Sequence, residues 1–185
     1  MKTALLVIDV QKAFLMRDAT GAVRSCLQAE QNIEALLTVF RGQGEKIIHI
    51  HHHSLEETSA FRANQSGCDP QAFAKPIAAE AVVIKHVNSA FIGTDLEVDL
   101  RNAGIDRLVV CGATANHCVE TTTRMAGNLG FEVLYASDAV WAYEAVGPDG
   151  ISHSAEQVHA MSLCNLDGEF AQVLPTMRIL EYINL

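Results

Sequence analysis

Short apolar runs alternate with longer segments of helical periodicity along the chain. Six apolar runs predict strands, at residues 4–10, 47–50, 81–85, 108–112, 131–136 and 170–174. Apolar residues at helical spacing predict helices at residues 23–42, 95–102, 116–129, 155–165 and 177–183. The segment 53–80 has no clear period and holds glycine and proline, which indicates a surface excursion of the kind that often forms a binding loop or a lid.

Strands that are apolar throughout and separated by helices indicate a parallel sheet covered on both faces. We therefore expect an α/β fold with a doubly wound open parallel sheet of about six strands and helices on both faces. Without a linker, an internal repeat or a low-complexity segment, residues 1–185 are expected to form a single domain. Sheets of this type bind ligands at the carboxyl ends of their strands.

Composition narrows the classes of partner. The 185 residues include 13 Lys and Arg against 22 Asp and Glu, a formal net charge of -9, which argues against a nucleic-acid partner. No apolar run approaches the roughly 20 residues of a membrane span, and no signal-peptide pattern is present. We expect a cytoplasmic protein with no membrane partner, whose five cysteines are reduced thiols because their spacing is irregular.

Three reactive side chains follow the predicted strands. Asp9 ends the first apolar run, Lys85 ends the third, and the fourth continues through ATANHC to Cys118 at the start of a helix. Because carboxyl ends of parallel strands share one edge, an acid, an amine and a thiol are expected to converge. A helix N-terminus and the Lys85 ammonium would both favour the thiolate of Cys118, and Asp9 could carry a proton to a leaving amine. The pattern indicates acyl transfer, although Asp and Lys at strand ends can also form a plain ion pair.

At these residues the chain resembles the isochorismatase-like cysteine hydrolases. The matching stretches are ALLVIDVQKAF (4–14), VVIKHVNSAFIGTDLEVDLRNAGI (82–105) and VVCGATANHCVETTTRMAGNLGF (109–131). An Asp-Ala pair at 138–139 and the segment from GPDGISHSAEQVH onward extend the resemblance over nearly the whole chain.

The resemblance implies an Asp-Lys-Cys catalytic triad that falls on Asp9, Lys85 and Cys118. It implies a cis peptide bond between Ala113 and Thr114, and an oxyanion hole made by the backbone N–H groups of Thr114 and Cys118. Cys118 would attack a carbonyl or amide carbon, Asp9 would protonate the leaving group, and water would hydrolyse the thioester. The family also implies a small-molecule substrate, no cofactor, and a homodimer or higher homo-oligomer.

Two departures from the family bear on substrate and metal. Many amidase members carry Thr where this chain has Ala115. The nicotinamidase branch has a metal site with an acidic residue after the second strand, and the corresponding HIHHHSLEET segment has none at that place. His49, His51 and His53 would share one face of a strand and could bind zinc, but a polar strand end is the preferred interpretation. We therefore expect no metal.

Several other residues are candidates for the substrate pocket or the interior. Phe14 and Phe91 flank triad residues within the matching motifs and are expected to line the pocket together with Gln11 and Asn116. Trp141 is an equal candidate for the pocket, a subunit contact or internal packing. Among the remaining cysteines, Cys68 is expected to be exposed and Cys111 buried, while Cys26 and Cys164 fall in helical patterns.

Three functions remain open at this point. The first is a cysteine-dependent amidohydrolase that cleaves a C–N bond through a covalent thioester. The second is an isochorismatase-type hydrolase in which Asp9 protonates an enol ether and Cys118 is dispensable. The third is a small-molecule-binding or thiol-sensing protein without catalysis. A Cys118→Ala variant separates the first from the second.

Overall fold

The computed structural model describes residues 1–78 and 80–183 and contains a six-stranded parallel sheet in the order β3-β2-β1-β4-β5-β8. Its strands are β1 (Thr3–Ile8), β2 (Lys46–His52), β3 (Ala81–Lys85), β4 (Arg107–Ala113), β5 (Glu132–Trp141) and β8 (Gln172–Leu174). The chain adds strands outward from β1 on one side and then outward from β4 on the other, so the order reverses between these two central strands. The structure therefore confirms the expected doubly wound α/β fold.

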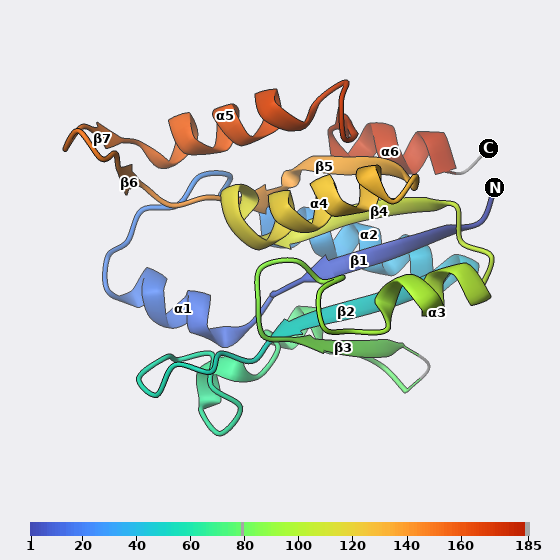
Figure 1. Cartoon of the computed structure of the whole chain (residues 1–185), viewed down its shortest axis with the longest axis horizontal. Coiled ribbons are helices and arrows are strands. Elements are labelled where there is room, and N and C mark those ends of the chain that lie inside the picture. The colour runs from blue at the N-terminus through green and yellow to red at the C-terminus, as the bar shows by residue number, and fades with distance from the viewer. Residues whose placement is uncertain (79, 184–185) are drawn as a thin grey trace.

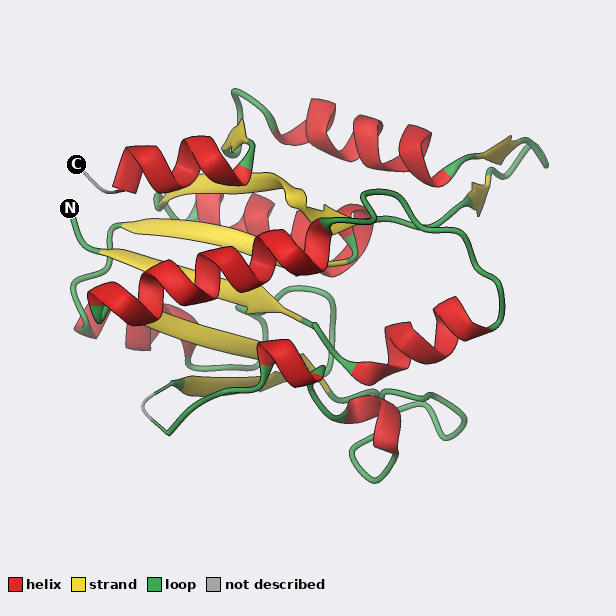
Figure 2. Ribbon diagram, turned by 180° about the vertical axis from the view of Figure 1, so that it is seen from behind, coloured by secondary structure: helices red, strands yellow, loops and turns green. Residues whose placement is uncertain are grey.

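Helices cover both faces of the sheet (Figures 1 and 2). One face carries α2 (Ala29–Gln43) and α6 (Thr176–Ile183), and the other carries α3 (Leu96–Asn102) and α4 (Glu120–Asn128). Helix α1 (Lys12–Ala19) follows β1, and α5 (Ala155–Leu166) lies beside α4, after the small hairpin of β6 (Ala145–Val146) and β7 (Ser152–His153). Two 3-10 turns, η1 (Ser66–Cys68) and η2 (Ala72–Ala74), lie in the long excursion between β2 and β3.

The apolar core consists of two clusters, one on each face of the sheet. Every residue of strand β1 is buried, which explains why residues 4–8 are all apolar. Leu5 and Val7 belong to the cluster under α2, whereas Leu6 and Ile8 belong to the cluster under α3 and α4. A central parallel strand of this kind has no solvent-facing side on which polar residues could alternate.

The structure differs from the sequence expectation at several element ends. The helix expected over 23–42 begins only at Ala29, because Cys26 adopts a left-handed backbone conformation (φ 51°). Helix α1 was not expected, and it buries only Ala13 and Phe14, which is too little apolar surface for a recognisable periodicity. The fifth strand was expected to stop at 136, but it continues to Trp141 through a register shift against β4.

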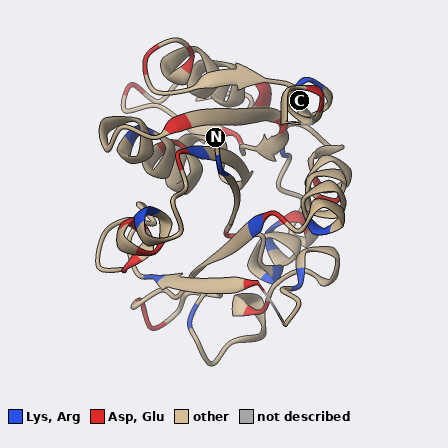
Figure 3. Cartoon of the chain, turned by 90° about the vertical axis from the view of Figure 1, so that its right-hand side faces the viewer, with Lys and Arg blue, Asp and Glu red and all other residues tan. Residues whose placement is uncertain are grey.

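The surface excursion expected over 53–80 is present in the described part of the chain. Residue 79 of this excursion and residues 184 and 185 of the expected 1–185 domain lie outside the described residues. None of the helices in residues 1–78 and 80–183 is both long and apolar enough to cross a membrane. Acidic and basic positions are interspersed over the helices and loops (Figure 3).

Candidate active site

The three side chains predicted from the strand ends meet around the Lys85 ammonium. Lys85 Nζ lies 2.7 Å from Asp9 Oδ2 and 3.2 Å from Cys118 Sγ. Asp9 and Lys85 are almost fully buried, with 2% and 1% of their surfaces exposed, and Cys118 is half-buried. A buried carboxylate or ammonium needs a partner, and each of these two supplies the charge that the other requires.

The backbone at the ends of β1 and β4 brings these residues together. Asp9 follows the last residue of β1 and has a left-handed conformation (φ 52°), which turns the chain away from the strand direction. Opposite it, Gly112 pairs with Ile8 and has φ 122°. A Cβ atom at this position would collide with the Ile8 backbone, so only glycine allows the two strand ends to approach so closely.

Cys118 lies in η3 (Ala115–Val119), a single π-helical turn that connects β4 to α4. The carbonyl oxygen of Thr114 accepts hydrogen bonds from the N–H groups of His117 (3.1 Å) and Val119 (3.3 Å). The Thr114 hydroxyl also contacts His117 Nδ1 at 3.0 Å. The peptide bond between Ala113 and Thr114 is cis in this structure. Single π-helical turns of this type are often found at functional sites.

The electrostatics of the cluster correct one expectation. Burial and the Asp9 charge together raise the pKa of Cys118 to about 12, although the Lys85 charge acts to lower it. The expected low-pKa thiol is therefore wrong for the resting site, where the proton remains on sulfur. Burial also raises the pKa of Asp9 above its ordinary value, against the opposing charge of Lys85, which makes this carboxylate a stronger base. The Asp9 charge is one of the causes that raise the pKa of Cys118, so the protonation state of the carboxyl affects that of the thiol.

Transfer of the thiol proton to Asp9 would change this balance. It would remove the negative charge that raises the pKa of Cys118 and leave the thiolate beside the Lys85 ammonium. The same three groups therefore support a neutral thiol at rest and a thiolate when Asp9 holds the proton.

His52 is a member of the site that the sequence analysis missed. Its Nδ1 lies 3.4 Å from Lys85 Nζ, and it pairs with Lys85 in the register between β2 and β3. Burial and the Lys85 charge lower the pKa of His52 to about 4, so the imidazole is neutral at pH 7 and accepts the third N–H of the ammonium. The signal that could have identified His52 is strand alternation, which places it on the opposite face of the strand from His49, His51 and His53.

The residues expected to line the pocket occupy different places. The Gln11 amide holds the backbone of His52, donating to its carbonyl oxygen (3.0 Å) and accepting from its N–H (2.9 Å), and also donates to the Cys68 carbonyl (2.8 Å). Phe14 packs edge-on against Phe61 and Trp141, and Trp141 is fully buried. These contacts give Gln11 and Trp141 structural roles in the resting site.

The other two expected pocket residues lie on the α4 side of the sheet. Phe91 stacks on Phe131 with ring centroids 6.1 Å apart, at the start of β5 rather than at its carboxyl end. Asn116 lines a cavity of about 740 Å³ between η3 and α5, together with Glu120, Gln157 and Met161 among others. Cys118 is not among the residues that line this cavity.

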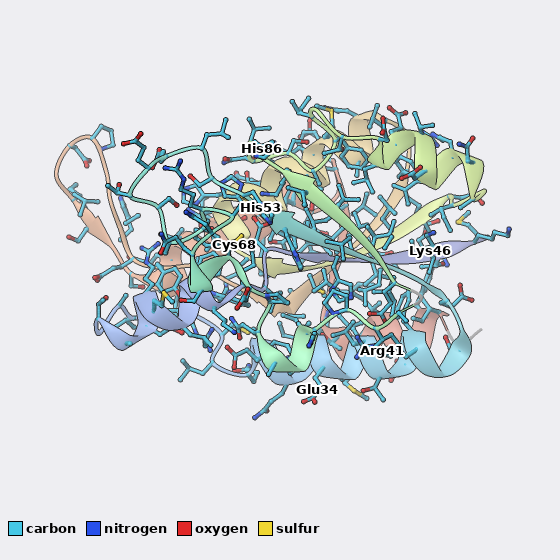
Figure 4. All side chains as sticks on the ribbon, turned by 90° about the horizontal axis from the view of Figure 1, so that it is seen from below. Glu34, Arg41, Lys46, His53, Cys68 and His86 are labelled. Carbon is cyan, nitrogen blue, oxygen red and sulfur yellow. The ribbon has the colours of Figure 1, made fainter. Side chains whose placement is uncertain are left out.

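The histidines at the end of β2 do not form a metal site in the described part of the chain. His49 Nε2 contacts Glu80 Oε2 at 2.8 Å, and no group of three or more His, Cys, Asp or Glu residues there is arranged to hold a metal ion. Figure 4 shows His53 and His86 near the same end of β2, and His86 Nδ1 contacts the carbonyl oxygen of His53 (2.7 Å). Ala115, where many amidases have Thr, is fully buried.

The cysteines other than Cys118 are also placed. The expectation that Cys68 is the exposed thiol is wrong, because it is 6% exposed and lies against the Gln11 amide, while Cys164 is exposed. Cys111 is fully buried, as expected. Cys26 is half-buried and donates to the Asp138 carbonyl oxygen at 3.2 Å. All five thiols are free.

The fold and the cluster define an α/β protein with an acid, an amine and a thiol at the topological switch point of its sheet. The isochorismatase domain model matches residues 3–177, and the chain belongs to the isochorismatase family of hydrolases. The isochorismatase family protein YrdC of Bacillus subtilis (strain 168) is 39% identical over 179 residues, covering 97% of this chain and 95% of that protein.

Two further proteins are similar to the chain. The crystal structure of an isochorismatase-family protein from Chromobacterium violaceum ATCC 12472 has a TM-score of 0.94 at 43% identity, covering 99% of this chain and 94% of the other. The N-carbamoylsarcosine amidase of an Arthrobacter species is 31% identical over 109 residues, which are 59% of this chain and 37% of the amidase.

Proposed function

We propose that this hydrolase is a cysteine-dependent amidohydrolase that cleaves a C–N bond of a small molecule through a thioester. The observation that carries the proposal is the position of Lys85 Nζ, 2.7 Å from Asp9 Oδ2 and 3.2 Å from Cys118 Sγ. The similarity to an amidase supports the type of bond that is cleaved. A base, a nucleophile and a fixed positive charge in contact are the groups that acyl transfer requires.

The first half of the reaction forms the thioester. Asp9 takes the thiol proton as Cys118 Sγ forms a bond to the amide carbon, and the carbonyl oxygen becomes an oxyanion. The backbone N–H groups of Thr114 and Cys118 hold this oxyanion. When the C–N bond breaks, Asp9 passes its proton to the departing nitrogen and becomes a carboxylate again.

The second half returns the free enzyme. Asp9 accepts a proton from a water molecule, whose oxygen attacks the thioester carbon. The C–S bond breaks, the acid product leaves, and the sulfur recovers a proton from Asp9. The Lys85 ammonium stabilises whichever of the carboxylate and the thiolate is charged. Protons balance in each half, and neither a metal nor a cofactor takes part in these steps.

A panel of small amides and ureas with detection of released ammonia or amine tests the proposal. With the best substrate, Cys118→Ala is expected to lose turnover by a factor on the order of 10³ or more, while its circular dichroism is unchanged. Cys164→Ala, which removes an exposed thiol, is the matched control and is expected to retain full turnover.

Mass spectrometry of quenched reactions adds a direct measurement of the intermediate. The wild-type chain is expected to gain the mass of the acyl group on the peptide that contains Cys118. Full turnover by the Cys118→Ala variant would contradict the covalent mechanism. So would hydrolysis of an enol ether in preference to every amide, and either result would favour a mechanism in which only Asp9 acts.

A further inference from the structure

We propose that Ser162 and Tyr135 are positioning residues for the nucleophile, and this inference rests on the proposed function of Cys118. Both hydroxyl groups contact the carbonyl oxygen of Ala115, the first residue of the turn that carries Cys118. Ser162 Oγ lies 2.7 Å from this oxygen and the Tyr135 hydroxyl lies 3.3 Å from it.

The two hydroxyl groups come from distant parts of the chain. Tyr135 is on β5 and is completely buried, and Ser162 is on α5 with only 2% of its surface exposed. The nucleophile's turn is therefore fixed from the adjacent strand and from a helix that lies beside α4 (Figure 1). Hydrogen bonds made in such buried surroundings are costly to leave unmade.

A count of protons shows why both hydroxyl groups are needed. Ser162 Oγ also lies 2.7 Å from Glu120 Oε2, at the start of α4, so its single proton faces two acceptors. Arg124 holds the other Glu120 oxygen at 2.8 Å, which keeps Glu120 in place as an acceptor. If Ser162 donates to Glu120, the Tyr135 hydroxyl donates to Ala115, and every acceptor has a proton.

The network acts on the distance between sulfur and ammonium. Only two residues separate Ala115 from Cys118, whose Sγ is 3.2 Å from Lys85 Nζ. If the Ala115 carbonyl is released, the turn can shift and carry the sulfur away from the charge that stabilises its thiolate. Displacements of about 1 Å at a reacting atom can cost roughly 100-fold in rate.

The alkylation rate of Cys118 measures this positioning without any substrate. Iodoacetamide labelling is followed by mass spectrometry of the Cys118 peptide across a pH series, because the rate depends on the thiolate population. In Ser162→Ala, labelling is expected to slow about tenfold or more at neutral pH, with its pH midpoint moved upward. Tyr135→Phe removes one oxygen atom from a buried ring and is expected to slow labelling in the same direction, because it removes the other hydroxyl group that contacts the Ala115 carbonyl.

Ser25→Ala is the matched control. Ser25 is also 2% exposed and also ties α5 to the sheet, through His159 Nδ1 (2.9 Å) and the Ala142 N–H (2.9 Å), but it does not contact η3. The control and the test variants are expected to lose similar stability, while only the test variants change the labelling of Cys118.

Turnover on the substrate from the amide panel completes the test. Ser162→Ala is expected to lower kcat by on the order of 10-fold with KM changed less than about twofold, because the network positions sulfur and not substrate. If labelling and kcat in both test variants match the Ser25→Ala control, the positioning role is refuted even though Cys118 is catalytic. If no amide is hydrolysed but labelling still depends on Ser162 and Tyr135, the positioning role stands and the amidohydrolase proposal fails.

Discussion

Glu80 is the residue whose substitution we expect to cost the most stability outside the reactive cluster. It precedes β3, has a side chain that is 6% exposed, and joins three other parts of the chain. Arg41 of α2 contacts its two carboxylate oxygens at 2.7 and 2.9 Å, His49 of β2 contacts it at 2.8 Å, and the Ile77 N–H donates to it at 2.9 Å. Burial alone would raise the pKa of Glu80, but these partners together lower it from 4.5 to about 2.

The lowered pKa of Glu80 makes the free energy of unfolding depend on pH. A change from 4.5 to about 2 corresponds to about 3 kcal/mol of folded-state stabilisation of the ionised carboxylate. Because the folded pKa is the lower one, this stabilisation is complete above pH 4.5 and is lost as the pH falls toward 2. Glu80→Gln is therefore expected to lower the free energy of unfolding by about 3 kcal/mol at pH 7, with the deficit shrinking below pH 4.5.

Urea unfolding of wild type and variant at pH 7, 5, 4 and 3, followed by circular dichroism, measures this difference. Glu181→Gln is the matched control, because Glu181 pairs with Arg178 on the surface, where it is 59% exposed. Its effect is expected to stay below about 1 kcal/mol at every pH. A Glu80→Gln deficit equal to that of the control, or one that is constant from pH 7 to pH 3, would refute the reasoning.

Three further outcomes are expected. The acid limb of kcat/KM should have its midpoint above pH 3.8, because burial raises the pKa of Asp9 and protonation removes the base; a midpoint at or below 3.8 in the pH–rate profile would contradict this. Gly112→Ala should cost several kcal/mol in thermal or urea unfolding, since its Cβ would meet the β1 backbone at positive φ, and a loss under about 1 kcal/mol would contradict it. In the native protein Cys164 should react with a maleimide well before Cys68, as read by peptide mass spectrometry, because only the former is exposed; equal rates would be inconsistent with this burial.

The convergence of the reactive groups could be predicted because it depends on strand order alone. Asp9, Lys85 and Cys118 each follow an apolar run, and carboxyl ends of parallel strands share one edge. The protonation state of the thiol could not be predicted, since it depends on how deeply Cys118 is buried and on its contact with Asp9. A sequence contains neither quantity.

Hydrogen bonds between side chains and residues far away in the sequence also could not be predicted from the sequence. The Gln11 amide looked like a pocket residue, but its hydrogen bonds hold the backbone of His52, 41 residues away. Ser162 gave no signal, because a serine on a helix is unremarkable until its distance to Ala115 is known. Helix α1 was missed for a simpler reason, since it buries little apolar surface.

The edge position of β3 has a consequence for the dynamics of the reactive cluster. Lys85 is at the end of an outermost strand that pairs only with β2 in the described sheet, whereas Asp9 follows the central strand β1. Edge strands open at a lower free energy than the centre of a sheet. Local opening of β3 would therefore remove the ammonium while the rest of the core stays folded. The fraction of molecules with an intact cluster then depends on how stably β3 pairs with the sheet. Glu80, the residue just before β3, contributes to that stability.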